Sequence, residues 1–252
     1  MAEQLIRINK YLSEQGVCSR READDYIKKG EVTIDGRVAY VGEKVSGAER
    51  ICLRGKEVGK KAPPPLYIAL YKPAGVVCTT KNDAHNVIDY LHLEQRVFPV
   101  GRLDKDSTGL LLLTNDGSIV NEMMRSSAHH EKEYIVQVDR VITPEFLKSM
   151  SHGIFLEDLH VFTRPCTVKK IKSDTFSIVL TQGLNRQIRR MCETLGYQVL
   201  SLKRIRILNI CLGDLPYGKW RNLTTEEVRE LKRELKEKPA HEHEREEQPE
   251  CE

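Results

Sequence analysis

The sequence lacks paired cysteines, a long apolar run and a leader-like N-terminus. Its seven cysteines are odd in number, widely spaced, and include no Cys-x-x-Cys pair or cluster with histidine. This spacing indicates reduced thiols rather than a disulfide framework or a zinc site. No apolar run approaches the ~18 residues of a membrane helix, and the first ten residues lack a signal-peptide core. We therefore expect a soluble cytoplasmic protein with no membrane association and no bound metal.

The sequence also lacks a large net charge: its 252 residues carry a formal net charge of only +3. That charge is unevenly distributed. Residues 237–252 contain seven acidic and two basic residues, so residues 1–236 carry about +8. A basic body favours an anionic partner, and nucleic acid is the first candidate. The acidic tail has no apolar face, and we expect it to be disordered.

Residues 1–60 have the pattern of a small module of two helices and a small sheet. Apolar residues over 4–11 predict a first helix that ends at Gly16, and Ser19 can cap a second helix over residues 20–29. Asp35-Gly36 lies between short alternating runs and predicts a hairpin, with a further strand over 50–53.

The proline-rich segment Gly59–Pro65 predicts an extended linker between two domains. The expected division is a module over 1–60, a linker over 61–66, a body over 67–236 and the tail over 237–252. The pattern of the body is α+β, with a mixed, mostly antiparallel sheet flanked by helices. Strands are expected over 66–72, 97–103, 110–114, 133–138, 175–181 and 205–211, and helices over 117–125, 143–152, 185–195 and 224–236.

Four basic residues, Arg20, Arg21, Lys28 and Lys29, lie on or at the ends of the second helix. Cations at a helix N-terminus interact unfavourably with the helix dipole, and phosphate binding would explain why they are there. The simpler alternative is a solvated basic face. The surrounding pattern closely resembles the S4 RNA-binding module. The matching residues are Gly16, Ser19, Arg20, Arg21, Ala23, Ile27, Gly30, Val32, Ile34 and Gly36, with Asp35 in place of the usual Asn. The resemblance implies RNA binding.

Three stretches of the body carry candidate chemistry. The run GRLDKDSTGLLLLTNDG places Arg102, Asp104, Lys105 and Asp106 directly before an apolar strand, where a solvated turn is the simpler alternative. In HEKEYIVQV, Lys132 and Tyr134 lie on one side of a strand, although a strand tyrosine is more often part of the core. In QGLNRQIRRMCETLG, residues 188, 191, 192 and 195 form an apolar helix stripe, and Asn185 can cap that helix.

Together these stretches resemble the pseudouridine synthases that modify ribosomal RNA, in the branch that contains RsuA, RluB, RluE and RluF. The signature residues are Gly101, Arg102, Leu103, Asp104, Asp106, Ser107, Gly109, Leu110 and Leu111, preceded by a Lys-Pro-x-Gly loop at Lys72, Pro73 and Gly75. An S4 module before such a body is usual in this branch. QGLNRQIRRMCE and HEKEY resemble the RluF group most, whose substrate is 23S rRNA.

The resemblance implies an isomerase that flips a uridine and needs neither cofactor nor metal. It implies Asp104 as the catalytic carboxylate, Arg189 as its ion-pair partner with Arg102 as second choice, and Tyr134 as the ring that stacks on uracil and assists proton transfer. Ile188 would close the apolar wall. We expect Lys72 and Lys132 to contact phosphates, and Arg186 and Arg190 to contact substrate. Either attack on carbon or removal of the 2′ proton by Asp104 remains open.

Alternatives remain for the target and for activity itself. The same activity on another rRNA or on tRNA is one, and a non-catalytic S4-type RNA-binding or ribosome-assembly factor is another. The presence of Asp104, Tyr134 and Arg189 disfavours the second. A glycoside hydrolase fits less well, because that chemistry usually needs two carboxylates across the bond. We expect RNA as the partner and a monomeric protein.

Overall fold

The computed structural model describes residues 5–59, 63–79, 85–124 and 129–236. The predicted acidic tail and part of the predicted linker lie outside the described residues. The chain divides into two compact units, the first of which includes the N-terminal residues through Tyr67. Each unit has its own hydrophobic core. None of the helices in the described part is long and apolar enough to span a bilayer.

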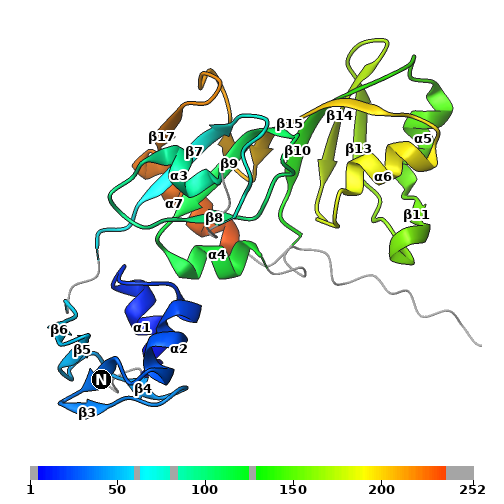
Figure 1. The fold of residues 1–252 in the computed structure, drawn as a ribbon. Coiled ribbons are helices and arrows are strands. Elements are labelled where there is room, and N and C mark those ends of the chain that lie inside the picture. Colours follow the sequence, from blue (N-terminus) through cyan, green and yellow to red (C-terminus); the bar gives the residue numbers. More distant parts are fainter. Residues whose placement is uncertain (1–4, 60–62, 80–84, 125–128, 237–252) are drawn as a thin grey trace, which may run out of the picture. The chain divides into compact units, whose positions relative to one another are not determined.

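The first unit contains the two predicted helices and two small sheets (Figure 1). Helix α1 spans Ile8–Glu14 and α2 spans Arg20–Lys28. One sheet pairs β1 (Ile6–Arg7) with β4 (Lys44–Val45), and the other has the order β3-β2-β5-β6. The latter strands are β2 (Val32–Ile34), β3 (Arg37–Val38), β5 (Ile51–Leu53) and β6 (Lys56–Glu57).

Local sequence signals explain most of this unit. Ser19 and Glu22 form both halves of a capping box at the start of α2, as predicted. Asp35 and Gly36 both have positive φ, the geometry of a tight two-residue hairpin turn between β2 and β3. The first helix begins later than predicted, at Ile8, because Ile6 and Arg7 pair with β4 instead.

The second unit is built on a nine-stranded mixed sheet, whose main path is β13-β14-β10-β15-β9-β7-β17. Most of its neighbouring strands are antiparallel, whereas β9 and β15 run parallel. Along the chain, the main strands are β7 (Tyr67–Lys72), β8 (Phe98–Val100), β9 (Thr108–Thr114), β10 (Lys132–Val138), β13 (Thr167–Lys170), β14 (Thr175–Leu180), β15 (Val199–Ile207), β16 (Ile210–Cys211) and β17 (Trp220–Asn222). Strands β8 and β16 pair with β9 and β15.

Helices flank this sheet (Figure 1). They are α3 (Val87–Leu91), α4 (Gly117–Met123), α5 (Pro144–His152), α6 (Gln187–Thr194) and α7 (Thr225–Lys236), and a small hairpin pairs β11 (Phe155–Leu156) with β12 (Val161–Phe162). Apolar residues of α5 and α6 pack against β10, β14 and β15 in one core. The predicted α+β class with a mostly antiparallel sheet is confirmed.

Two local predictions in this unit need correction. The strand predicted over 205–211 is interrupted: residues 205–207 end β15 and residues 210–211 form β16, and the turn between them contains Leu208, which has positive φ, and no glycine. Asn185 does not cap α6. The helix begins after Arg186, which has positive φ, and the Gln187 side chain accepts a hydrogen bond from the Leu184 N–H at 3.1 Å.

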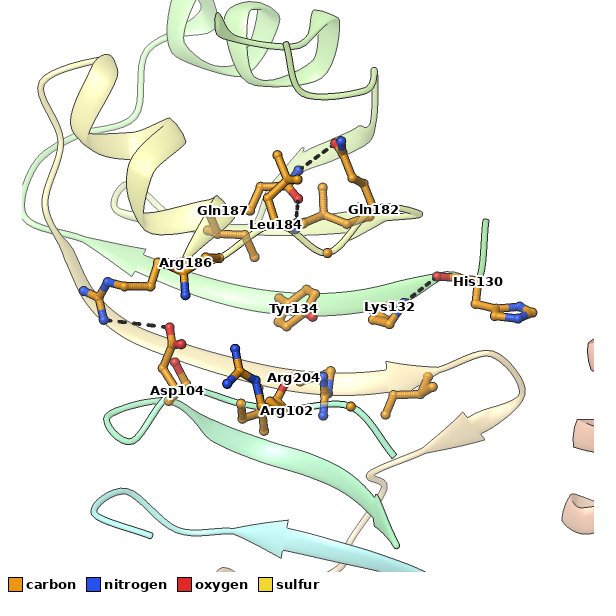
Figure 2. Close-up of a pocket in the computed structure, with 18 of the residues that line it drawn as sticks. Arg102, Asp104, His130, Lys132, Tyr134, Gln182, Leu184, Arg186, Gln187 and Arg204 are labelled. Carbon is orange, nitrogen blue, oxygen red and sulfur yellow. Dashed lines mark hydrogen bonds and ion pairs between the residues drawn. The ribbon is translucent and has the colours of Figure 1, made fainter. Parts of the chain in front are cut away.

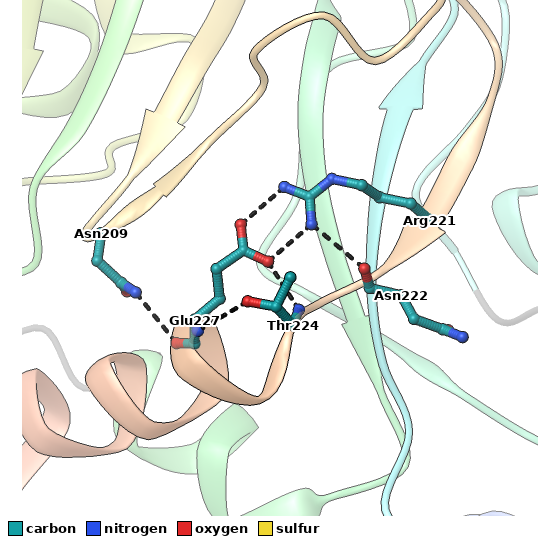
Figure 3. Close-up of polar contacts among 5 residues, drawn as sticks. All are labelled: Asn209, Arg221, Asn222, Thr224 and Glu227. Atoms are coloured by element: carbon teal, nitrogen blue, oxygen red, sulfur yellow. Dashed lines mark hydrogen bonds and ion pairs between the residues drawn. The ribbon is translucent and has the colours of Figure 1, made fainter.

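At the start of α7, a charged side chain takes part in the hydrogen bonds that cap the helix (Figure 3). The Glu227 N–H donates to Thr224 Oγ1, and the Thr224 N–H donates to the Glu227 carboxylate. Arg221, on β17, donates to both carboxylate oxygens of Glu227 at 2.7 Å. The Arg221 hydrogen bond lowers the pKa of Glu227 below its usual range. The pair joins the last strand to the last helix.

Candidate active site

A cavity of about 460 Å³ opens in the second unit, between the loop 100–107, the strands β10, β14 and β15, and the start of α6 (Figure 2). Its size is typical of a pocket for a small molecule or a single base. Six basic side chains line it, from Arg102, Lys132, Arg164, Arg186, Arg189 and Arg204, together with one carboxylate, that of Asp104. The cavity therefore suits an anionic or electron-rich ligand.

Asp104 lies at the edge of this cavity, directly before the buried strand β9. The Ser107 N–H donates to the Asp104 carbonyl and closes the turn that carries the carboxylate. The Asp104 side chain is 31% exposed. The next strand residues, 110–113, are buried. A rigid strand thus fixes a turn whose acidic side chain stays accessible.

Two arginines face the Asp104 carboxylate. Oδ2 of Asp104 is 3.9 Å from Arg186 Nη1 and 4.0 Å from Arg189 Nε. The Arg189 Nε is buried and has no hydrogen-bond partner among the described residues. Both contacts are long for hydrogen bonds, so the carboxylate is held by charge while its lone pairs stay open. Arg102, the second-choice partner, lines the cavity but forms no ion pair with Asp104 in the described part of the chain.

Tyr134 and Ile188 form an apolar wall of the cavity. Tyr134 is on β10, half-buried, and Figure 2 shows its ring between the Asp104 side and the Gln182–Gln187 side. Ile188 is buried at the start of α6. The Gln187 side chain contacts Gln182 Oε1 at 3.4 Å and orders the loop that completes the rim. An exposed aromatic face beside a carboxylate can stack a flipped base.

Lys132 lies inside the cavity rather than on an outer surface. Its ammonium donates to the His130 carbonyl at 3.0 Å. Burial, followed by repulsion from Arg204, lowers the pKa of Lys132 to about 8. Burial also lowers the pKa of His130, which lines the same cavity. Lys132 therefore faces the space beside Tyr134, and its contact with a phosphate of the substrate stays a prediction.

Lys72 is not part of the cavity. It is fully buried, and its ammonium donates to the carbonyls of Pro73 at 2.7 Å and Lys105 at 3.3 Å. Burial lowers the pKa of Lys72. The expectation of a phosphate contact is therefore wrong, since no phosphate reaches a buried ammonium. Lys72 instead ties the end of β7 to the turn that carries Asp104.

Arg190 also lies outside the cavity. Its guanidinium pairs with Asp158 and donates to the Asn185 carbonyl at 3.1 Å. The expected substrate contact of Arg190 does not fit this arrangement, whereas its neighbours Arg186 and Arg189 do line the cavity. In the first unit, Arg20, Arg21, Lys28 and Lys29 are all exposed on or next to α2.

The sequence interpretation missed Arg204, His130, Gln187 and Ser107 as cavity residues. Arg204 and Gln187 are buried polar residues, and the Ser107 hydroxyl is buried without a partner in the described residues. The only sequence signal for Arg204 is a basic residue within the apolar alternation of 199–207. No group of three His, Cys, Asp or Glu residues in the described part of the chain is placed to hold a metal ion.

Comparison with known proteins defines the class. Residues 66–194 match the RNA pseudouridylate synthase family, and residues 6–51 match the S4 domain. The chain belongs to the RNA pseudouridylate synthase family and is an enzyme that forms pseudouridine.

Individual relatives extend this match over nearly the whole chain. The chain is 47% identical to the dual-specificity RNA pseudouridine synthase RluF of Escherichia coli K12, over 90% of this chain and 78% of that protein. It is 38% identical to the ribosomal large subunit pseudouridine synthase B of Bacillus subtilis, over 90% and 95%. A crystal structure of a pseudouridylate synthase superposes with a TM-score of 0.66 at 28% identity, covering 90% of this chain and 99% of that one.

Proposed function

We propose that the enzyme isomerises one uridine of 23S ribosomal RNA, with Asp104 as its catalytic carboxylate. The observation that supports this most directly is the cavity that places Asp104, held by Arg186 and Arg189, beside the ring of Tyr134. The Bacillus subtilis relative is named for the large ribosomal subunit, which favours that RNA.

In this proposal the target uridine leaves its helix and enters the cavity, as enzymes that act on a base require. Tyr134 stacks on the uracil, and Ile188 completes the apolar wall. Asp104 lies beside the ribose, where it either attacks carbon or removes the 2′ proton. The C1′–N1 bond breaks, the base turns, and C5 bonds to C1′. The C5 proton leaves to a base and N1 takes up a proton, so the product has the same atoms as the substrate.

In this proposal one unit binds RNA and the other carries out catalysis. Residues 1–60 form the RNA-binding domain, with Arg20, Arg21, Lys28 and Lys29 on phosphates, and residues 67–236 form the catalytic domain. We take a monomer as the active form. A cytoplasmic location follows from the ribosomal substrate.

A second RNA substrate is a further part of the proposal. The Escherichia coli relative is named dual-specificity, and a tRNA is the candidate that we favour for a second target.

Mapping pseudouridines in total rRNA and tRNA, from cells with and without the gene, tests the target. Loss of one 23S rRNA site in the deletion strain, restored by the wild-type gene but not by Asp104→Asn, is the expected result. Loss of a small-subunit site instead would overturn the 23S assignment. Loss of a tRNA site in addition would support the second substrate, and unchanged tRNA would remove it.

A further inference from the structure

Arg204 is a buried arginine of the cavity that has no acidic partner among the described residues. Arg204 is only 2% exposed, and among the described residues no carboxylate lies within the 4.0 Å of an ion pair with it. Its neighbour on the strand, Arg206, pairs with Glu131 and Glu133. A buried charge is costly unless it is paired, so an unpaired one in an active site needs a reason.

Hydrogen bonds orient this guanidinium without neutralising it. Nε donates to the Leu110 carbonyl at 2.7 Å, and Nη1 donates to the Arg102 carbonyl at 3.4 Å. Nη2 is buried and has no partner in the described part of the chain. The guanidinium carbon lies 6.0 Å from the centre of the Tyr134 ring, at the limit of a cation–π contact. Figure 2 shows Arg204 on the Asp104 side of that ring.

The backbone is shaped to place Arg204 there. A register shift between Glu133 and Tyr134 skips one residue of β15, so that Arg204 lies opposite Tyr134 and Ile207 opposite Lys132. Bulges of this kind re-aim side chains beside active sites. On the other side of β15, Gly109 approaches so closely that a Cβ there would lie 2.2 Å from the Arg204 carbonyl oxygen. The strand pairing on both sides therefore fixes the position of Arg204.

We propose that Arg204 supplies a fixed positive charge that stabilises the negative charge on the uracil after it leaves the ribose. This inference rests on the proposed function, which places the base against Tyr134. When C1′–N1 breaks, the bonding electron pair stays on N1 and spreads over the two carbonyl oxygens. That charge is cancelled when C5 bonds to C1′; the C5 proton then leaves to a base, and N1 takes up a proton. Arg204 is a positioning residue rather than a catalytic one, because its charge acts on the base from a distance, beside the ring of Tyr134.

Such a charge accelerates the reaction because it favours the detached base over the bound uridine. Only interactions that strengthen toward the transition state raise the rate, and a preorganised charge in a closed site needs no rearrangement during the reaction. Asp104 cannot serve this purpose, since a carboxylate repels the anion. The six basic side chains of the cavity, opposed by one carboxylate, have the sign that this step requires.

The test compares two RNA substrates that carry uridine or 5-fluorouridine at the target position. Fluorine withdraws electrons and stabilises the uracil anion by itself, so the substrate depends less on a protein charge. Consumption of the starting nucleotide is measured in single turnover, because fluorine at C5 prevents the final proton loss. With Arg204→Gln, we expect a loss of about 10²-fold on uridine and a loss at least about fivefold smaller on 5-fluorouridine.

Three further variants complete the experiment. Arg204→Lys keeps the charge and is expected to keep the wild-type ratio of the two rates, even where both rates fall. Arg204→Met is a second neutral variant, used if Arg204→Gln does not fold by circular dichroism. Lys203→Gln removes a charge from the same strand without touching the cavity lining, and is expected to behave as wild type.

Equal losses on the two substrates for both neutral variants, or a changed ratio in Arg204→Lys, would overturn the role of Arg204. A wild-type enzyme that consumes neither substrate would instead overturn the proposed function, and this inference with it. RNA affinity measured in parallel separates a loss of binding from a loss of rate.

Discussion

Two arginine–carboxylate clusters of the second unit differ in how completely the carboxylate is satisfied. Glu227 accepts two hydrogen bonds from Arg221 at 2.7 Å and a third from the Thr224 N–H at 2.8 Å. Asp104 faces two arginines at 3.9 and 4.0 Å. One of the two nitrogens that face it, Arg189 Nε, has no hydrogen-bond partner among the described residues.

The difference separates a pair that stabilises the fold from one that is available for chemistry. Short bidentate bonds satisfy Glu227 and fix the start of α7. The long contacts of Asp104 keep the carboxylate close to positive charge but leave its oxygens open to a ligand. A buried donor without a partner is costly in a resting protein and useful when a substrate enters. The predictions below alter one cluster and compare the result with the other.

Asp104→Asn carries the largest expected effect. The amide keeps the size of the side chain and removes its charge, so turnover should fall by at least about 10²–10⁴-fold, the range for one acid or base group. RNA affinity should stay within a few-fold, and melting temperature should hardly change. Single-turnover pseudouridine formation on rRNA measures the loss. Asp106→Asn, an exposed neighbour in the same turn, is the control and should be close to wild type.

Arg189→Ala and Arg186→Ala compare the two arginines that face Asp104. The Arg189 side chain is 11% exposed and that of Arg186 is 43% exposed, so solvent screens the second contact more. We expect a rate loss of about 10²-fold for Arg189→Ala and about tenfold or less for Arg186→Ala. Single-turnover rates and melting curves measure both. A greater loss at Arg186 would show that the exposed arginine holds the carboxylate.

The sequence predicted those features of the fold and of the site that lie within one short segment. The turn that carries Asp104 directly precedes its own buried strand, and the capping residues Ser19 and Glu22 are three residues apart. Local spacing was therefore enough to predict both the turn and the helix cap. The helix stripe at Ile188, Met191 and Cys192 is likewise buried as its periodicity predicts.

Long-range contacts account for the features that the sequence did not predict. The ammonium of the buried Lys72 donates a hydrogen bond to the carbonyl of Lys105, which is 33 positions away in the chain. Arg190 forms an ion pair with Asp158, which lies on another element. Arg204 faces the cavity only because a bulge shifts the register of β15 against β10. None of these partners has a signal at a fixed spacing in the chain.

Glu227→Gln tests the structural cluster. Loss of the charged bonds to Arg221 should lower the free energy of unfolding by about 1–2 kcal/mol, with unchanged turnover well below the melting temperature. The pKa of Glu227 is lowered in the fold, chiefly by Arg221, so the stabilisation is complete above its ordinary value of 4.5 and is lost as the pH falls further. The difference between wild type and variant should therefore shrink in acid.

Urea unfolding at pH 7 and at about pH 4 measures that difference. Glu226→Gln is a matched control on the same helix turn, where both members of the pair with Arg229 are more than half exposed. It should change stability much less. A loss at Glu226 equal to that at Glu227 would show that the bidentate geometry adds nothing.

Arg20→Ala combined with Arg21→Ala extends the comparison to the first unit and has the smallest expected effect. These exposed arginines have no carboxylate within ion-pair distance in the described part of the chain, whereas Arg50 and Arg54 of the same unit pair with Glu57 and Glu31. Unpaired cations suit phosphates, so the double variant should weaken RNA binding alike across sequences. The slope of log affinity against log salt should flatten by about 0.7–0.9 for each phosphate that the variant no longer neutralises. Arg50→Ala with Arg54→Ala is the control. If both pairs changed the slope equally, the carboxylates would not distinguish RNA-binding arginines from structural ones in this unit.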